Sequence, residues 1–350
     1  MIQIQGRSRF RLLMISLKYL PLLKSETVTR SPIARHREAR PASLFIDSKT
    51  RDRRESAACF TSSPIPLPGR EGLRGTVRSS KAVCGRKTSP HRFHETRSPG
   101  DGIRIARQLT ASDSQDCFDI VAMGGDGTLH EVLNGIADPS KVRLGIVPCG
   151  SGNDFAAVAG IPASAEGALN VLLSGEARFT DYLECGGIRG INAIGTGIDV
   201  EILRRYNRMK LLKGSAAYLS SLVLTLFSYR AKRFSEKRAG ETRSHNALIA
   251  CAGNGRRIGG GIPVCPKAVI DDGLMDIVIV DDIPRRGIPG GFVKLMKGQI
   301  LNLPTTAFRR DSRLRLESEG PLPIQIDGEI YEGLPFDVRV ISQALRVYRP

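Results

Sequence analysis

The chain has 350 residues, of which 41% are apolar, 25% charged and 5% aromatic, and this composition excludes a collagen, a coiled coil and a wholly disordered chain. The formal charge of +17 is concentrated in residues 1–100, which hold 21 Lys and Arg against 7 Asp and Glu, so the rest of the chain is nearly neutral. Nucleic acid is therefore not an expected partner of the folded part. At about 150 residues per domain, the length predicts two domains.

The cysteines and the apolar runs indicate where the chain resides. Its seven cysteines include no CxxC pair, which argues against a secreted disulfide scaffold and a zinc ribbon and favours a reducing cytoplasm. The apolar runs at residues 12–23 and 216–227 are interrupted or too short to span a bilayer, which needs about 18 residues. We therefore expect a cytoplasmic protein that is at most peripheral to a membrane.

Residues 1–91 are rich in basic residues, Pro and Ser and have no sustained apolar period. This pattern predicts a basic extension that is either disordered or the product of an aberrant reading frame. A basic tail that binds nucleic acid or membrane is the alternative, but no aromatic side chains alternate with the charges as stacking onto bases would require.

Residues 92–180 alternate between strand and helix patterns. An apolar run at residues 118–123 is followed by the glycine turn GGDGT at residues 124–128 and then by apolar residues at helical spacing. The unit repeats, with an apolar run at residues 143–148 and a second glycine turn, GSGND, at residues 150–154. Alternating β and α units predict a parallel sheet whose ligand loops lie at the carboxyl ends of its strands.

Residues 181–350 are dominated by strand patterns, with the clearest alternation at residues 336–341. These strands predict an antiparallel sheet, most simply a β-sandwich. One amphipathic helix at residues 214–228 interrupts them and has basic residues on both sides. This helix either docks on a membrane surface or packs against the sheet.

The two glycine turns together predict a phosphate cradle. Glycines let the backbone approach a phosphate, Asp126 between them can meet a hydroxyl group or a magnesium ion, and the helix that follows offers free N–H groups. Thr128 can cap this helix or bond a phosphate oxygen. The alternative is an ordinary turn in which Asp126, and likewise Asp154, serves only as a helix N-cap, while Asn153 orients its own loop.

Other polar motifs have simpler interpretations. The pairs Asp272-Gly273 and Asp327-Gly328 are typical of β-turns. His130 lies off the apolar stripe of its predicted helix and is expected to be an exposed polar residue. The string GNGRRIGGG at residues 253–261 looks like another phosphate loop, although a lone glycine-rich string is weak support.

Four strings, in this order, resemble one known family: MGGDGTLHEVLNGI, GIVPCGSGNDFA, NGRRIGGGIPVCPKAVIDDGLMDIVIV and IQIDGE. The family is the diacylglycerol kinase catalytic domain in its bacterial lipid-kinase form, related to sphingosine and ceramide kinases, and the resemblance covers residues 94–350. It implies an NAD kinase/diacylglycerol kinase-like fold. An N-terminal parallel α/β domain that binds ATP, at residues 92–180, would be followed by a β-sandwich domain for the lipid substrate, at residues 181–350.

The resemblance also implies an activity and a set of site residues. The γ-phosphoryl group of MgATP would pass to a lipid hydroxyl at the membrane surface, with diacylglycerol, giving phosphatidic acid, as the leading acceptor. Glu329 would be the general base, with Asp327 as a supporting or alternative carboxylate and Asp126 as a third catalytic carboxylate. Magnesium would be held by the Asp272 side chain and by the backbone carbonyls of Val269 and Leu274. The expected nucleotide-binding residues, cradle included, are Thr96, Gly124, Gly125, Asp126, Gly127, Thr128, Leu129, His130, Glu131, Ser151, Asn153 and Asp154.

One departure from the family keeps other functions open. Members usually open with an apolar strand and an Asn-Pro-x-Ser-Gly loop, and the nearest candidate before residue 92, residues 44–49, lacks the Pro and Gly. The alternatives are therefore an NAD-kinase-like enzyme with a soluble acceptor and a non-catalytic protein that binds lipid or nucleotide. The sequence does not decide which lipid is phosphorylated, or whether the protein forms a homodimer.

Overall fold

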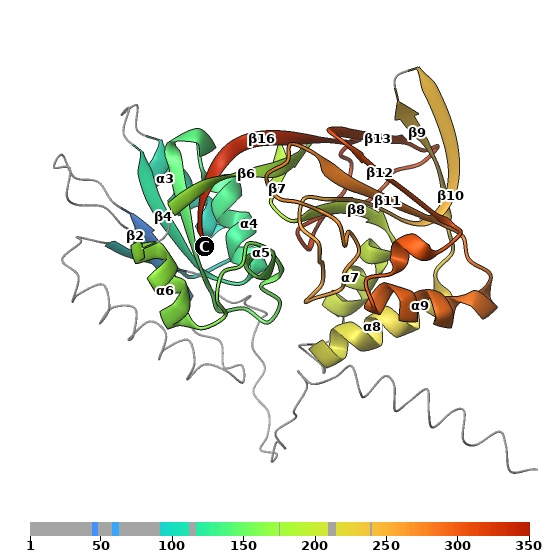
Figure 1. The fold of residues 1–350 in the computed structure, drawn as a ribbon, viewed down its shortest axis with the longest axis horizontal. Helices are drawn as coiled ribbons and strands as arrows, with labels where there is room; N and C mark the ends of the chain where they lie inside the picture. The colour runs from blue at the N-terminus through green and yellow to red at the C-terminus, as the bar shows by residue number, and fades with distance from the viewer. Residues whose placement is uncertain are drawn as a thin grey trace, which may run out of the picture.

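The structure, a computed structural model, describes residues 44–47, 58–62, 92–111, 117–174, 176–208, 215–238 and 240–350. Most of residues 1–91, for which a basic extension is predicted, lies outside the described residues. The described parts of this stretch are two strands, β1 (Leu44–Asp47) and β2 (Ala58–Ser62). The other described residues form two lobes joined by long strands (Figure 1).

The first lobe is a mostly parallel sheet covered by helices (Figure 1). Its further elements are β3 (Arg92–Thr96), α3 (Asp101–Thr110), β4 (Phe118–Gly124), α4 (Asp126–Gly135), η1 (Pro139–Lys141), β5 (Val142–Pro148), α5 (Asp154–Val158) and α6 (Ala165–Ser174). The strand order is β1-β3-β2-β4-β5, with β2 parallel to β3 and β4, and β4 parallel to β5. The parallel sheet predicted from the two glycine-turn units is confirmed.

The strand beside β4 in this sheet is not the one that the sequence offered as the opening strand. The nearest candidate, residues 44–49, contains β1, which runs antiparallel to both β2 and β3. The parallel strand beside β4 is β2 instead, through the pair Ala58 and Ile120. Residues 58–62 are too short a run to be recognised as a strand from the sequence, and only their pairing with β3 and β4 identifies them.

The second lobe is built mainly from antiparallel strands with three helices on one side (Figure 1). Its elements are β7 (Ile188–Gly190), β8 (Ala193–Gly197), α7 (Ile198–Arg208), α8 (Ser215–Ser228), β9 (Lys232–Arg238), β10 (Glu241–Gly253), β11 (Met275–Asp281), η2 (Arg285–Gly287), α9 (Ile288–Met296), η3 (Ile300–Asn302), β12 (Thr306–Asp311), β13 (Arg313–Glu317), β14 (Ile324–Ile326) and β15 (Glu329–Tyr331). The described helices of both lobes include none with the length and apolar character to cross a bilayer.

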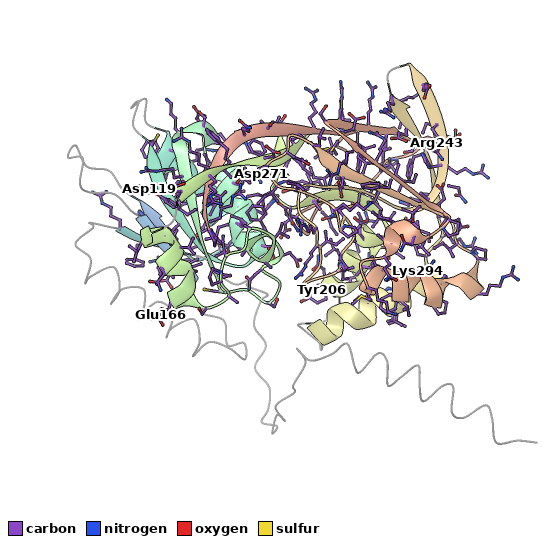
Figure 2. All side chains as sticks on the ribbon, in the orientation of Figure 1. Asp119, Glu166, Tyr206, Arg243, Asp271 and Lys294 are labelled. Carbon is purple, nitrogen blue, oxygen red and sulfur yellow. The ribbon has the colours of Figure 1, made fainter. Side chains whose placement is uncertain are left out.

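Two long strands join the lobes. β6 (Glu176–Cys185) pairs antiparallel with β16 (Phe336–Arg349) along most of their length. β16 begins beside β13 in the second lobe and ends parallel to β5 in the first lobe, where Val347 lies opposite Leu144. Arg349 at its end also pairs at 2.5 Å with Asp271, which is labelled in Figure 2. The expected boundary between residues 180 and 181 thus falls inside β6, and the chain crosses between the lobes twice.

Period-two alternation in the second lobe separates two cores. On β10, Ala250 and Ala252 face the strands β6, β13, β14 and β16, whereas Cys251 faces α7 and α8. On β11, Ile277 and Ile279 likewise face the strands, and Val278 faces the helices. Each fully buried Leu or Ile contributes about 1.5–3 kcal/mol. The predicted fold class, an α/β domain followed by a β-sandwich, is confirmed.

A buried charge network lies on the face of the projecting β9–β10 hairpin. His245 is buried between two carboxylates, with Nε2 3.4 Å from Glu236 Oε2 and Nδ1 3.1 Å from Asp281 Oδ1. The hydrogen bond to Glu236 raises the pKa of His245, Asp281 adds to this effect and burial opposes it. The same hydrogen bond, supported by Arg309, lowers the pKa of Glu236 to about 2.

This network predicts that the protein loses stability as the pH rises. The folded-state pKa of His245 is above its unfolded value, so its stabilising contribution is complete below the unfolded pKa of about 6.5 and disappears as the pH passes through the folded pKa. We expect the free energy of unfolding, measured with urea between pH 6 and 9, to fall with pH in the native chain. The His245→Gln variant should lack this part of the decline, and an equally steep decline in the variant would contradict the assignment.

Candidate active site

Three glycine loops from both lobes meet at one point. A Cβ atom on Gly150 would lie 2.5 Å from Cα of Gly125, so the turns that end β4 and β5 touch through their backbones. A Cβ atom on Gly152 would lie 2.8 Å from the Asp126 carboxylate and 3.5 Å from Cα of Gly260. The two loops predicted to form a cradle therefore lie side by side, and the GNGRRIGGG string of the second lobe lies against them.

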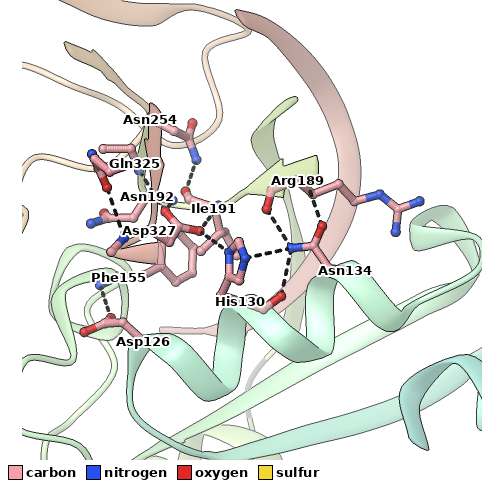
Figure 3. Close-up of polar contacts among 12 residues, drawn as sticks. Asp126, His130, Asn134, Phe155, Arg189, Ile191, Asn192, Asn254, Gln325 and Asp327 are labelled. Carbon is pink, nitrogen blue, oxygen red and sulfur yellow. Dashed lines mark hydrogen bonds and ion pairs between the residues drawn. The ribbon is translucent and has the colours of Figure 1, made fainter. Parts of the chain in front are cut away.

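The two aspartates of the cradle bind neighbouring loops and do not cap their own helices. Asp126 Oδ1 accepts the backbone N–H of Phe155, in the first turn of α5, at 3.4 Å (Figure 3). Asp154 Oδ2 accepts the N–H of Gly260 from the second lobe at 2.7 Å. Asn153 bonds both the N–H and the carbonyl of Gly150, at 2.9 and 2.7 Å, so its side chain orients its own loop, as the alternative interpretation held.

Burial changes the proton affinity of both carboxyl groups. It raises the pKa of Asp126, with the nearby Asp327 carboxylate adding to the effect and the N–H groups of α5 opposing it. It raises the pKa of Asp154 to about 6, with Gly260 opposing and Asp126 adding. Asp126, Asp154 and Asp327 thus form one acidic group around the loops, an environment that favours a cationic or protonated partner.

The other predicted nucleotide-binding residues divide into two groups. Thr96 ends β3 at the same sheet edge as the glycine turns, and its buried Oγ1 has no hydrogen-bond partner among the described residues. Ser151 is exposed at the loop tip. By contrast, Leu129 is part of the core, and the Glu131 carboxylate accepts the N–H groups of Gly100 and Gly102 at 2.9 Å each, which caps α3.

Of the remaining cradle residues, Gly124 packs on Thr128, because a Cβ atom there would lie 2.2 Å from Thr128 Oγ1. Gly127 faces open space, since a Cβ atom on it would meet nothing within 4 Å. A small cavity opens beside these turns and is lined by Gly125, Asp126 and Asn153.

Asp327 and Gly328 form the turn of the β14–β15 hairpin. Both have positive φ, 49° and 90°, as a two-residue type I′ turn requires. The Asp327 carboxylate accepts three backbone N–H groups of the segment that leads into β8, from Ile191 at 2.7 Å, Asn192 at 2.9 Å and Ala193 at 3.0 Å (Figure 3). Both Asp327 oxygens therefore accept backbone hydrogen bonds that hold this segment.

Glu329 lies on the face of β15 that meets the first lobe. Alternation along a strand places Glu329 and Tyr331 on the same face. Tyr331 OH lies 2.8 Å from Nε2 of His130 on α4, so this face is turned toward the helix that begins at the GGDGT loop. Burial, with Glu329 and Asp327 adding, raises the pKa of Tyr331 to about 12. The hairpin interpretation and the predicted carboxylate role are thus compatible.

The prediction that His130 is exposed is wrong. Its side chain is 2% exposed and lies between α4 and the β14–β15 hairpin. The apolar stripe of α4 identifies only the face that packs on its own sheet. The opposite face of α4 is covered by the second lobe, which the local pattern of the helix does not reveal.

Two buried asparagines that the sequence did not single out hold neighbouring backbone segments together. Asn254 is buried and donates to the carbonyls of Asp181 at 2.9 Å and Ile191 at 2.7 Å, and its N–H bonds the carbonyl of Asn192. Asn192 in turn donates to the carbonyl of Arg257 at 2.5 Å. An asparagine between glycines in GNGRR was the available indication.

The turn expected to bind magnesium already has partners for its carboxylate. Asp272 Oδ1 accepts the N–H of Leu274 at 3.1 Å, and Oδ2 lies 3.4 Å from Arg310 Nη1. Arg310 also bonds Asp276 Oδ1 at 3.0 Å and the carbonyl of Lys267 at 2.5 Å. Nowhere in the described part of the chain do three or more His, Cys, Asp or Glu side chains gather as metal ligands would. The residues near Val269 therefore do not fit a divalent cation as they stand.

Family models match both lobes. The diacylglycerol kinase catalytic domain matches residues 68–185, and the YegS C-terminal NAD kinase beta sandwich-like domain matches residues 192–349. The first match begins well before the expected start at residue 92.

Curated relatives cover most of the chain. A probable lipid kinase YegS-like of Pseudomonas syringae pv. tomato is 32% identical over 81% of this chain and 92% of its own length. A diacylglycerol kinase of Mycobacterium tuberculosis is 28% identical over 72% of this chain and 83% of its own length. A solved diacylglycerol kinase structure from Bacillus anthracis shares the fold, with a TM-score of 0.54, 20% identity and coverage of 73% of this chain and 83% of that one.

Proposed function

Because the chain belongs to the bacterial lipid kinase family of the diacylglycerol kinase catalytic domain, as its motifs predicted, we propose that it transfers the γ-phosphoryl group of ATP to a lipid hydroxyl, with diacylglycerol as the first acceptor to test. The observation that carries this proposal is the placement of Glu329. Its strand face is turned toward α4, whose N-terminus lies at the glycine loops, and this arrangement supports a carboxylate that acts opposite a phosphate bound there.

The chemistry follows from these positions. The close-packed glycine turns and the free N–H groups at the start of α4 suit the phosphates of a nucleotide. Glu329 would accept the proton of the lipid hydroxyl as the hydroxyl oxygen bonds to the γ-phosphorus and the bond to ADP breaks. Asp327, whose oxygens hold the segment at residues 191–193, would keep the turn that carries Glu329 in place.

Magnesium enters this proposal only as the ion that accompanies ATP. Such an ion would offset charge on the phosphates, and Asp126 would be the cradle carboxylate available to it. No step is derived through the turn at Asp272, because Arg310 already neutralises that carboxylate.

We also propose that the lipid is taken from a membrane surface. α8 exposes Leu224, at 54%, and Val223, at 40%, and the exposed basic residues Arg208 and Arg230 flank the helix. Exposed aliphatic side chains with basic neighbours suit an interface with anionic lipid. The proposed localisation is therefore cytoplasmic and peripheral to the membrane, with no role for nucleic acid.

The test is a phosphorylation assay with the full chain. The protein is incubated with labelled ATP, magnesium and mixed micelles that contain diacylglycerol, sphingosine or a total lipid extract, with NAD as a soluble acceptor in a separate arm. We expect labelled phosphatidic acid from the diacylglycerol arm. Labelled product from NAD alone would favour the NAD-kinase-like alternative, and ATP binding without any product would favour a non-catalytic binding protein.

The cradle makes a separate prediction about Gly150. The Gly150→Ala substitution places a Cβ atom 2.5 Å from the backbone of Gly125, so the two turns must move apart. We expect ATP affinity to fall about tenfold or more, equal to roughly 1.4 kcal/mol, as measured by equilibrium titration. Gly290→Ala on α9, where a Cβ atom meets nothing within 4 Å, is the matched control and should bind ATP as the native chain does. Equal affinities for the two variants would contradict a cradle at this point.

A further inference from the structure

His130 is a buried polar side chain between α4 and the β14–β15 hairpin. It lies on α4, one turn after Asp126, and it is 2% exposed. Nε2 lies 2.8 Å from Tyr331 OH, and Nδ1 faces Asp327 Oδ2 at 3.6 Å with no closer partner (Figure 3). The imidazole therefore touches the residues on both sides of Gly328-Glu329.

The two groups beside His130 indicate which of its ring nitrogens carries the proton. The Asp327 carboxylate can only accept, so the imidazole proton belongs on Nδ1. Nε2 then offers a lone pair, and the Tyr331 hydroxyl, which keeps its proton because its pKa is raised to about 12, donates to it. His130 thus hydrogen-bonds Tyr331 through Nε2 and lies in electrostatic contact with Asp327, at 3.6 Å, through Nδ1.

The rest of α4 is fixed to the second lobe as well. Asn134, one turn after His130, exchanges two hydrogen bonds of 2.8 Å with the backbone of Arg189 on β7. The Arg189 guanidinium bonds the carbonyls of Leu133 at 3.0 Å and Ile136 at 2.5 Å, at the end of α4. Because Asn134 and Arg189 hold the distal part of the helix, His130 is the contact nearest the glycine cradle and the one that meets the hairpin.

We propose that His130 is a positioning residue that sets Glu329 at the correct place against the cradle, an inference that rests on the proposed kinase function. It contacts Tyr331, which shares a strand face with Glu329, and Asp327, which forms the turn before Glu329. The role is distinct from nucleotide contact, for which the sequence had selected this residue. A displacement of about 1 Å in a reacting group can cost about a hundredfold in rate, so a short buried contact suffices for this role.

The test is a double-variant cycle in kcat with diacylglycerol and ATP. We expect His130→Leu and Tyr331→Phe each to lower kcat about tenfold or more, with KM for ATP changed less than about twofold, because the cradle itself is intact. The double variant should be no slower than the slower single variant, since both substitutions remove the same contact. His130→Gln, whose amide reaches the position of Nε2, should recover most of kcat.

Tyr348→Phe is the matched control, because Tyr348 OH also makes a buried hydrogen bond, to Asp119 at 2.8 Å, on the opposite side of the first sheet from the cradle helices. It should lose some stability and keep its kcat. The positioning role would be overturned if either single variant left kcat unchanged, or if the losses in kcat added up in the double variant. It would also be overturned if KM for ATP rose while kcat stayed the same. An inactive native chain would overturn the proposed function instead, so the two failures are distinguishable.

Discussion

The Glu329→Gln variant is expected to lose roughly 10²- to 10⁴-fold in kcat, the range typical for removal of a general base. Glutamine has nearly the same shape as glutamate, but its amide does not accept the proton of the lipid hydroxyl. KM for ATP should stay within about twofold of the native value, because the residues of the glycine cradle are unchanged in this variant. The measurement is the initial rate of lipid phosphorylation at saturating diacylglycerol.

Glu332→Gln provides the matched control for this variant. Glu332 directly follows β15, three residues after Glu329; its side chain is 69% exposed and pairs with Arg204 of α7 at 2.5 Å. An exposed ion pair of this kind contributes about 0–1 kcal/mol to stability, and its loss should leave kcat unchanged. If Glu329→Gln were as active as Glu332→Gln, the base would have to be sought elsewhere in the acidic group of the cradle.

The Asp327→Ala variant is expected to lose about 3 kcal/mol or more of stability, at roughly 1–3 kcal/mol for each buried donor left without a partner. The donors are the N–H groups of Ile191, Asn192 and Ala193, which lose their shared acceptor at once. The positive φ of 49° at Asp327 adds a local cost, because alanine tolerates this region less well than aspartate. Urea unfolding gives the change in the free energy of unfolding.

Asp337→Ala is the matched control, because it also removes an aspartate but leaves no buried backbone N–H group without an acceptor. Asp337 pairs with the exposed Arg313 at 2.6 Å, and the hydrogen bond from Arg313 lowers the pKa of Asp337. Its replacement should cost no more than about 1 kcal/mol. A similar small loss for Asp327→Ala would mean that the three N–H groups find water or another acceptor, and the turn would then not depend on its carboxylate.

The contrast between Asp327 and Glu329 explains how one short hairpin can serve both stability and chemistry. The first carboxylate is consumed by three backbone donors and joins the hairpin to β8. The second begins the next strand, on the face that His130 and Tyr331 fix against α4. Replacement of Glu329 should therefore lower the rate alone, whereas replacement of Asp327 should lower the stability and, through the turn that carries Glu329, the rate as well.

Local pattern was sufficient for the elements that carry the cradle. The apolar runs that became β4 and β5 are buried on both faces of the sheet, so they read as continuous strands of a parallel sheet. The glycine turns after them could be placed at one sheet edge, because the carboxyl ends of parallel strands share an edge. The turn formed by Asp327 and Gly328 was also readable, since this dipeptide favours positive φ at both positions.

Contacts between distant segments were not readable. His130 was assigned to solvent because its helix stripe describes packing on one side only, whereas the second lobe covers the other side. Asp154 was expected to bind a nucleotide or cap a helix, and it bonds Gly260, a partner more than a hundred residues away. Asn192 carries no local pattern and Asn254 only its place between two glycines, since an asparagine becomes a structural residue through the backbone groups it meets.

By itself, the sequence determined the family, the two architectures and the residues of the glycine loops, because periodicity and turn chemistry act over a few neighbouring residues. The tertiary structure alone decided how these pieces serve a site: β16 returns to the first sheet, Arg310 occupies the carboxylate expected to hold a metal, and His130 joins α4 to the hairpin. These features depend on where separate segments pack, and packing free energy is gained from partners that are far apart along the chain.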